Sequence, residues 1–320
     1  MLAVPIGRQP LRAAFVAALL TAAGCAGLPQ TAANRERPVG PPVAVSAAPA
    51  PGVRSILPNA KESVKFLVIG DSGTGDRLQF EVAARIAEAH RVFAFDRALM
   101  LGDNLYGRDN AAAYRNKFER PYAPLLDAGV KFFASLGNHD DPSQRFYAKF
   151  NMNEKRYYSH DTGDVRFFAL DSTYMGPEQL TWLQEELSKS DHKWKIVYMH
   201  HPMYSSGLRH GSTPSLRSAL EPLFLKYGVD VVFSGHDHFY ERTEPQKGIV
   251  YVVQGGSAKL RRGNIRRSSE LTAKGFDTDR SFTLAEIAGD RMYLETISRT
   301  GAIVDSIVVT RRETPDSSSE

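Results

Sequence analysis

Cysteine is almost absent from this chain of 320 residues, because Cys25 is the only one. No disulfide can therefore form within the chain, and no cluster of thiolates can bind a metal. A large excess of one charge is absent too, since 40 Lys and Arg residues stand against 36 Asp and Glu residues. A net charge of +4 is too small to indicate nucleic-acid binding, although it is compatible with attraction of an anionic substrate. The sequence also contains no repeat of fixed period. Its length and 42% apolar content predict one large globular domain or two ordinary ones.

A long hydrophobic run is also missing, and the N-terminal apolar stretch is too short to span a bilayer comfortably. Arg8 and Arg12 precede the residues AAFVAALLTAAG, which end at Cys25. A basic start, an apolar stretch and small residues at its end are typical of a secretory signal. The segment resembles a bacterial lipoprotein signal, in which the cysteine becomes the lipidated N-terminus. We therefore expect residues 1–25 to direct export to the periplasm or the outer surface, with Cys25 as the candidate lipid anchor. Ordinary cleavage that leaves a soluble protein is the alternative.

The composition divides the rest of the chain into three parts. Residues 26–60 are rich in Pro and Ala without a hydrophobic period, which predicts a semi-extended linker. Residues 61–312 carry the patterns of a folded domain. Residues 313–320 are polar, and we expect them to form a frayed tail.

Apolar runs typical of buried strands alternate with amphipathic segments typical of helices across the first half of the folded region. Strands are predicted at VKFLVIGD, RALMLGDN, VKFFASLGNHD, KWKIVYMHHP and VDVVFSGHDH, and a hairpin turns at Thr162–Gly163. Helices are predicted at RLQFEVAARIAEAHRVF, AAAYRNKFERPYAPLLDAG with a break at Pro121, GPEQLTWLQEELSKS and TPSLRSALEPLFLKYG. After these, only strands are expected, at GIVYVVQGG, FTLAEIAGDRMYLETISR and IVDSIVVTR. The pattern predicts an α/β fold.

Polar side chains follow several of the predicted strands at the point where each strand ends. The side chains are Asp71, Asp103 with Tyr106, Asn138 in the GNHD loop, His200, and the pair His236 and His238. Because ligands bind at the carboxyl ends of strands in open α/β sheets, we expect these groups to cluster. Two carboxylates, an amide, a phenol and three imidazoles suit Fe, Mn or Zn. Seven donors are too many for one tetrahedral ion, whereas two ions that share a carboxylate would use them all.

Five ordered blocks give the cluster a family resemblance. They are GDSG from Gly70, GDNLY from Gly102, GNHD from Gly137, VYMH from Val197 and GHDH from Gly235. Together they resemble the calcineurin-like metallophosphoesterases, and within these the purple acid phosphatases, over the span from Phe66 to Thr310. Most of that superfamily has a ligating histidine where this chain has Gly73. The resemblance implies that Tyr106 supplies the missing ligand as a phenolate.

The resemblance also implies a four-layer α/β/β/α sandwich and a role for each matching residue. A ferric ion would take Asp71, Tyr106, His238 and a bridging Asp103, and a divalent ion (Fe, Zn or Mn) would take Asp103, Asn138, His200 and His236. His139 and His210 would face the substrate, and Asp140 would orient the imidazole of His139. His201 and Glu241 are expected to be structural. The histidines outside the blocks, His90, His160 and His192, are expected to be solvated surface residues.

The implied function is an exported dinuclear-metal phosphatase that hydrolyses phosphomonoesters by attack of metal-activated hydroxide. Its partner would be a phosphorylated small molecule and not a nucleic acid. Two alternatives remain: a phosphodiesterase or nucleotide hydrolase with the same metal site, and a non-catalytic metal-binding surface lipoprotein. The basic stretch KLRRGNIRRSSELTAKG from Lys259 either attracts phosphorylated substrates or is an ordinary solvated loop.

Overall fold

The computed structural model of the chain describes residues 55–311, which contain two mixed β-sheets. The first sheet has six strands in the order β13-β12-β11-β1-β2-β3. Their bounds are β1 (Val64–Ile69), β2 (Arg97–Leu101), β3 (Lys131–Ser135), β11 (Ser281–Ala288), β12 (Arg291–Ser298) and β13 (Ile303–Thr310). Strands β1, β2 and β3 are parallel, whereas β11 pairs antiparallel with β1 and starts a meander through β12 to β13.

The second sheet has seven strands in the order β10-β8-β9-β7-β6-β5-β4. Their bounds are β4 (Tyr158–Thr162), β5 (Val165–Ala169), β6 (Trp194–Met199), β7 (Val231–Ser234), β8 (Tyr240–Thr243), β9 (Val250–Gln254) and β10 (Thr272–Phe276). The central strands β5, β6, β7 and β9 are parallel to one another, whereas β4, β8 and β10 pair antiparallel with their neighbours. The short strands β8 and β10 were not expected from the sequence.

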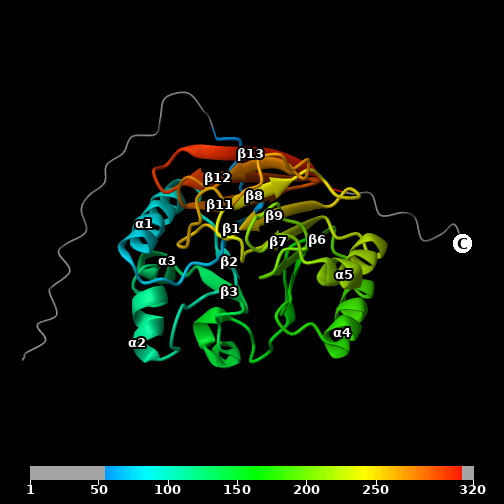
Figure 1. Ribbon diagram of the computed structural model, residues 1–320, viewed down its shortest axis with the longest axis horizontal. Coiled ribbons are helices and arrows are strands. Elements are labelled where there is room, and N and C mark those ends of the chain that lie inside the picture. The colour runs from blue at the N-terminus through cyan, green and yellow to red at the C-terminus, as the bar shows by residue number, and fades with distance from the viewer. Residues whose placement is uncertain (1–54, 312–320) are drawn as a thin grey trace, which may run out of the picture. The chain divides into compact units, whose positions relative to one another are not determined.

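Helices cover the outer faces of both sheets, with α1–α3 beside β1–β3 and α4–α5 beside β4–β7 (Figure 1). The helices are α1 (Arg77–Val92), α2 (Ala111–Tyr114), α3 (Ala123–Asp127), α4 (Pro177–Ser188) and α5 (Pro214–Lys226), with a π-helical turn at Arg115–Glu119 and 3-10 turns at Pro142–Phe146 and Ala148–Phe150. This arrangement confirms the four-layer α/β/β/α sandwich. The break expected at Pro121 is present, because α3 starts after it.

Local sequence explains where the longest helix begins and which face it buries. The Asp76 side chain accepts hydrogen bonds from the backbone N–H groups of Leu78 and Gln79, and it thereby caps the N-terminus of α1. Val82, Ala83 and Ile86 are buried at helical spacing. The same face therefore packs α1 onto the sheet.

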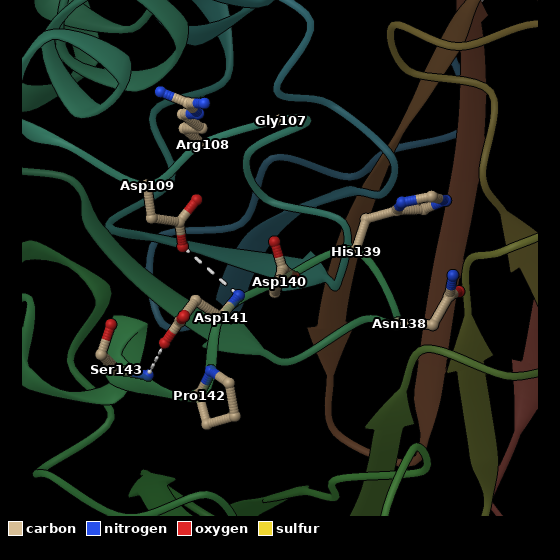
Figure 2. Close-up of a pocket in the computed structure, with 9 residues that line it drawn as sticks. All are labelled: Gly107, Arg108, Asp109, Asn138, His139, Asp140, Asp141, Pro142 and Ser143. Atoms are coloured by element: carbon tan, nitrogen blue, oxygen red, sulfur yellow. Dashed lines mark hydrogen bonds between the residues drawn. The ribbon is translucent and has the colours of Figure 1, made fainter. Parts of the chain in front are cut away.

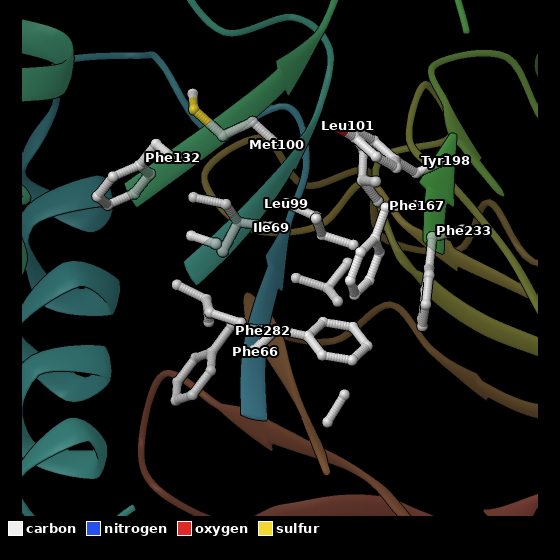
Figure 3. Packing of buried hydrophobic residues seen from close by; sticks show 14 of the residues in the cluster. Phe66, Ile69, Leu99, Met100, Leu101, Phe132, Phe167, Tyr198, Phe233 and Phe282 are labelled. Atoms are coloured by element: carbon white, nitrogen blue, oxygen red, sulfur yellow. The ribbon is translucent and has the colours of Figure 1, made fainter. Parts of the chain in front are cut away.

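Aromatic side chains fill the space between the two sheets. Phe66 of β1 lies with its ring centre 5.2 Å from that of Phe167 in β5 and 6.2 Å from that of Phe233 in β7, both edge-to-face (Figure 3). A second apolar cluster lies under α4 and α5, where Leu183 and Phe224 belong to one cluster with residues of β5, β6 and β7. Full burial of one such side chain contributes about 1.5–3 kcal/mol, so this core fixes the two sheets relative to each other.

The described residues begin within the segment that the sequence assigns to a linker. Backbone N–H groups of Asn59 and Ala60 donate to the buried carboxylate of Glu286 at 2.7 and 2.6 Å, and that of Ile56 donates to Glu295 at 3.0 Å. Residues 55–60 are thus attached to strands β11 and β12. The predictions for residues 1–54 and 312–320, which include the signal segment and the polar tail, lie outside the described residues. None of the helices in residues 55–311 has the length and apolarity needed to cross a membrane.

His160 is not the solvated surface residue that the sequence suggested. Its ring stacks on Phe133 and Phe167, with ring-centre distances of 3.8 and 4.9 Å. Its Nε2 lies 3.3 Å from the hydroxyl of Tyr198, and its Nδ1 is shielded from solvent without a hydrogen-bond partner among residues 55–311. Burial lowers the pKa of His160 to about 3, and the charge of Arg97 adds to this effect.

This environment predicts how stability depends on pH. As pH falls below about 6.5, the unfolded chain binds a proton at His160 before the folded chain does, so the free energy of unfolding decreases. His160→Phe keeps the aromatic stack and removes the titrating nitrogen. Between about pH 6.5 and 4.5, the free energy of unfolding of this variant should fall by about 1 to 2 kcal/mol less than that of the wild type, as measured by urea unfolding. His90→Gln, a change outside this stack, should keep the wild-type slope, and an unchanged slope in His160→Phe would show that the folded protein accepts the proton.

Candidate metal centre

The polar residues that follow the strands converge, as the sequence predicts. Three of them, which follow β1, β2 and β7, form one group. The hydroxyl of Tyr106 donates to Asp71 Oδ1 at 2.9 Å and lies 3.3 Å from His238 Nε2. The same nitrogen of His238 lies 3.3 Å from Asp71 Oδ1. A carboxylate, a phenol and an imidazole therefore direct their donor atoms to one point.

A second group of donors surrounds His200, which follows β6. Its Nε2 lies 3.0 Å from Asn138 Oδ1, 3.4 Å from Asp103 Oδ1 and 3.1 Å from His236 Nδ1. Donor atoms of Asp71, Asp103 and His200 all lie within 4.8 Å of one another, so Asp103 stands between the two groups. The structure thus brings together all seven predicted ligands, in the two sets that the resemblance implies.

Hydrogen bonds between the sheets hold this geometry. His200 Nδ1 lies 2.9 Å from the backbone oxygen of Leu101 at the end of β2, which leaves Nε2 to face the site. In the other direction, the backbone N–H of His236 after β7 donates to Asp71 Oδ2 at 2.8 Å. Each sheet therefore orients a ligand of the other.

Three of the seven donors have a left-handed backbone conformation, which is uncommon outside glycine. The φ angles are 53° at Asp71, 50° at Asp103 and 69° at His236. Each residue directly follows a strand or a glycine at a strand end, and the left-handed conformation turns the chain sharply at that point. Strain of this kind is retained where the surrounding structure and the function require it.

The electrostatics of the site suit bound cations. Asp71 and Asp103 are both buried, and no Lys or Arg of residues 55–311 forms an ion pair with either. Burial raises the pKa of Asp71, and the charge of Asp103 raises it further against the opposing effect of His200. Burial lowers the pKa of His236 to about 2 and that of His238 to about 4, so these imidazoles stay neutral with free lone pairs. Repelling carboxylates and neutral imidazoles are a donor set that fits metal ions.

Gly73 is required by packing at the position where most of the superfamily has a histidine. A Cβ atom there would lie 1.8 Å from the backbone oxygen of Asn104. The backbone oxygen of Gly73 also accepts the N–H of Tyr106 at 2.9 Å. The GDSG and GDNLY loops are therefore in direct contact, and this contact brings the Tyr106 phenol next to the Asp71 carboxylate.

The predicted substrate-facing residues lie around this centre. His139 is exposed, its backbone N–H donates to Asp103 Oδ1 at 3.0 Å, and its ring centre lies 5.3 Å from that of Tyr106. His210 is exposed as well, with its ring centre 4.2 Å from that of His236. Both imidazoles thus lie beside candidate ligands and remain accessible to a substrate.

Asp140 has a different environment from the one expected. Its carboxylate accepts the backbone N–H groups of Gly137, Asn104 and Leu105 at 2.8 to 3.1 Å, and the Nε2 of Gln144 at 2.8 Å. The ring of His139 extends away from it (Figure 2). Asp140 therefore joins the GNHD and GDNLY loops to each other and does not orient the His139 imidazole.

His201 and Glu241 differ in how close they come to the centre. Nitrogen atoms of His201, His200 and His236 lie within 4.8 Å of one another, and Ser172 Oγ lies 3.0 Å from His201 Nδ1. His201 is thus nearer to the donors than the sequence indicated. Glu241 is buried and accepts the backbone N–H of Ser206 at 2.9 Å, which agrees with a structural role.

A cleft of about 550 Å³ adjoins the centre (Figure 2). Asn138 and His139 line it on the side of the donors, and Arg108, Asp109 and Ser143 are among its other lining residues. The sequence did not indicate this cleft, because only the GNHD block in its wall is a recognisable motif, whereas residues 107–109 and 141–143 carry none.

Comparison with known proteins assigns this geometry to a family. A family model described as calcineurin-like phosphoesterase matches residues 64–240. This span is more than half of the chain and contains all five motif blocks. This chain belongs to the calcineurin-like phosphoesterase family.

Several relatives of this phosphoesterase are purple acid phosphatases. Purple acid phosphatase 21 of Arabidopsis thaliana is 33% identical over 211 residues, which are 59% of this chain and 47% of that protein. The chain therefore spans less than half the length of that relative. Tartrate-resistant acid phosphatase type 5 of Homo sapiens is 25% identical over 316 residues, with 82% of this chain and 95% of that protein covered. These similarities place the chain in the purple acid phosphatase-like branch of the family.

Solved structures share the fold. A purple acid phosphatase from yellow lupin seeds superposes with a TM-score of 0.65 at 21% identity, over 80% of this chain and 55% of that one. The anchor in the inner membrane complex of Plasmodium gives the same TM-score at 18% identity, over 78% of this chain and 90% of that one. At these identities the likeness establishes the fold alone.

The repulsion between Asp71 and Asp103 predicts the behaviour of Asp103→Asn, which removes one of the two charges. We expect the purified variant to retain less metal than the wild type, because the shared ligand is weakened. In the metal-free state we expect it to unfold at a higher temperature than the metal-free wild type, because Asp71 no longer faces a second buried charge.

Metal analysis and thermal unfolding with and without chelator measure both effects. Asp109→Asn, which neutralises a carboxylate in the adjoining cleft, is the matched control and should leave both quantities at their wild-type values. Two metal ions per chain in Asp103→Asn would contradict a bridging role for Asp103.

Proposed function

We propose that this phosphoesterase is an acid phosphatase that hydrolyses phosphomonoesters with a ferric and a divalent ion. The observation that carries the proposal is the convergence of seven donors in two sets around Asp103. The relatives described as acid phosphatases support the choice of substrate class. Phenolate and carboxylate donors favour a hard trivalent ion, and the amide and imidazoles favour a divalent ion (Fe, Zn or Mn).

Each ion has a distinct set of candidate ligands. The trivalent ion would be held by Asp71, Tyr106, His238 and Asp103, and the divalent ion by Asp103, Asn138, His200 and His236. When bound, the two ions supply positive charge that polarises the phosphate and lowers the pKa of the attacking water.

The exposed histidines carry out the remaining steps. His139 and His210 are positioned on the rim of the centre, where their protonated rings stabilise the charge that develops on the phosphoryl oxygens. One of them donates a proton to the leaving oxygen. Because a histidine must be protonated for this step, activity belongs to the acidic range of pH. The cleft beside His139 has room for the leaving group of a small organic phosphate.

Two other functions use the same fold. Phosphodiesters or nucleotides could be hydrolysed at the same donors, so the ligand set alone does not select the monoester. The anchor protein from Plasmodium shares the fold, which keeps a non-catalytic binding protein as the second alternative. The presence of all seven donors and both exposed histidines favours an enzyme.

We also propose that the chain is exported and anchored by a lipid at Cys25. Arg8, Arg12 and the apolar stretch before Cys25 support this proposal, and they lie outside the described residues. A periplasmic or outer-surface location would give the enzyme access to phosphorylated small molecules outside the cytoplasm.

The function is tested on phenyl phosphate and diphenyl phosphate with the iron- and zinc-loaded protein. We expect faster hydrolysis of the monoester, a maximum at acidic pH, and loss of activity with a chelator. His139→Ala should keep its metal and lose roughly 100-fold in turnover, the scale of a lost general acid.

His90→Ala, on helix α1, is the control and should keep full activity. Faster turnover of the diester would favour the phosphodiesterase. A metal-replete protein that turns over neither ester would favour the binding protein.

The ferric ion is tested through Tyr106. A phenolate bound to ferric iron absorbs visible light, so the iron-loaded wild type should be purple or pink. Tyr106→Phe removes only the oxygen and should abolish this band while the melting temperature of the metal-free protein stays close to that of the wild type. The exposed Tyr174 supplies the control, because Tyr174→Phe should keep the colour. A band that persists in Tyr106→Phe would exclude the phenolate assignment.

A further inference from the structure

Asp237 stands between the two histidines of the GHDH block, but its side chain serves a different segment of the chain. The residue is fully buried. Its Oδ2 accepts hydrogen bonds from Ser205 Oγ at 2.5 Å and from the backbone N–H of Gly211 at 3.1 Å. The carboxylate therefore joins the GHDH block to both ends of residues 205–211, a segment that contains His210 and that we call the His210 loop.

The backbone of the His210 loop is shaped around this carboxylate. A Cβ atom at Gly207 would lie 2.2 Å from Asp237 Oδ2, so only glycine fits against the carboxylate at that position. Gly211 has a φ angle of 73°, a left-handed conformation that glycine adopts without strain. The Ser212 hydroxyl closes the base of the loop, because it accepts the N–H of Ser205 at 3.0 Å and donates to the backbone oxygen of the same residue at 3.1 Å.

The loop presents one of the two exposed imidazoles of the site. The His210 ring centre lies 4.2 Å from that of His236, and Gly211, whose N–H is held by Asp237, is the next residue along the chain. Within the described residues the His210 side chain forms no hydrogen bond. The backbone of the loop therefore determines where this imidazole lies.

We propose that Asp237 is a positioning residue that holds the His210 imidazole beside the candidate metal centre. This inference rests on the proposed function, because it assigns Asp237 a role in the step that His210 performs. The carboxylate acts through the backbone of the His210 loop. Because Asp237 directly follows His236 in the chain, this attachment fixes the imidazole relative to a candidate ligand of the divalent ion. An imidazole that is already held in place does not have to be ordered during the reaction, which lowers the free-energy barrier.

The two carboxylate oxygens of Asp237 have different environments, and this difference allows two substitutions to be compared. Oδ2 accepts both hydrogen bonds, whereas Oδ1 is shielded from solvent and has no hydrogen-bond partner among residues 55–311. An asparagine places its amide oxygen where Oδ2 was and its NH2 group where Oδ1 was. Asp237→Asn thus keeps both hydrogen bonds and removes the charge. Asp237→Leu keeps the approximate shape and removes both hydrogen bonds.

Turnover of phenyl phosphate by the iron- and zinc-loaded protein measures the effect on the reaction. Asp237→Leu should lower kcat about 10-fold or more and leave KM within about threefold of the wild-type value, because the displaced imidazole is needed in the transition state. Asp237→Asn should keep kcat within about threefold of the wild-type value, because both hydrogen bonds remain. In the His210→Ala background, Asp237→Leu should cost less than about threefold, because the group that it positions is absent. All variants should keep the metal content of the wild type.

Amide hydrogen exchange tests the attachment of the loop without the reaction. The N–H of Gly211 and its neighbours in the His210 loop should exchange about 10-fold faster in Asp237→Leu and at nearly the wild-type rate in Asp237→Asn. Glu286→Leu is the matched control, because Glu286 is also a buried carboxylate that accepts a serine hydroxyl and backbone N–H groups, from Ser63 at 2.6 Å and from Ala60 at 2.6 Å. This control should lower the melting temperature and leave kcat and the exchange of the His210 loop unchanged.

Three results would overturn the inference. Loss of metal from Asp237→Leu in proportion to its loss of turnover would assign the effect to the neighbouring ligands His236 and His238. An Asp237→Asn variant as slow as Asp237→Leu would assign it to the charge. Additive losses in Asp237→Leu and His210→Ala would show that Asp237 does not act through His210.

A second variant tests the same attachment from the loop side if Asp237→Leu does not fold. Ser205→Ala removes one of the two hydrogen bonds to Asp237 and leaves the GHDH block unchanged. It should lower kcat less than Asp237→Leu does, and this loss should disappear in the His210→Ala background. A wild-type kcat in Ser205→Ala together with wild-type exchange of the loop would overturn the inference.

The two measurements distinguish failure of this inference from failure of the proposed function. A wild type that hydrolyses phenyl phosphate, with unchanged turnover and exchange in Asp237→Leu, would refute the inference and keep the function. A metal-loaded wild type that hydrolyses no phosphate ester would refute the function, whereas faster exchange of the His210 loop in Asp237→Leu would still support the attachment of the loop by Asp237.

Discussion

Repulsion between the buried carboxylates of Asp71 and Asp103 is the constraint on which the rest of the centre depends. Neither has a Lys or Arg partner within the described residues, and burial together with the neighbouring charge raises the pKa of Asp71. Such a pair is unfavourable unless positive charge lies between the two groups. The neutral imidazoles of His236 and His238 do not supply that charge, whereas bound metal ions do. The folded chain therefore holds a cluster whose electrostatic balance is completed by its metals.

The two-sheet architecture keeps this unfavourable pair in place. The carboxylates follow parallel strands of the first sheet, and the histidines follow parallel strands of the second. His200 Nδ1 faces the Leu101 carbonyl, and the His236 N–H faces Asp71, so each sheet orients donors of the other. The aromatic core around Phe66 and Phe167 supplies the packing energy that holds the sheets together. Packing thus supports the left-handed backbone at Asp71, Asp103 and His236.

The sequence was sufficient to predict which polar residues lie together, because strand ends and ordered motifs are local features. It predicted the strands that position them for the same reason, whereas β8 and β10 lack a clear alternation and depend on pairing with neighbours. Contacts between distant segments were not accessible. The stacking of His160 requires β4 and β5 to pair in register and Phe133 of the other sheet to pack against them. The attachment of Asp140 to Asn104 joins loops that are 36 residues apart. The clash that excludes a side chain at Gly73 depends on the GDNLY loop in the same way.

The donors and the residues around them are built from different kinds of structure. The donors directly follow strands that are buried on both faces, so their positions are fixed by the core. Lys259 and Arg261 belong to a loop whose backbone N–H groups are attached to Asp71 and His238, and Arg209 belongs to a loop attached to Asn264. A loop can change its side chains without disturbing the metals, because only its backbone N–H groups make the attachment. In this chain the attached loop is basic, so the side chain of Lys259 places positive charge beside Tyr106.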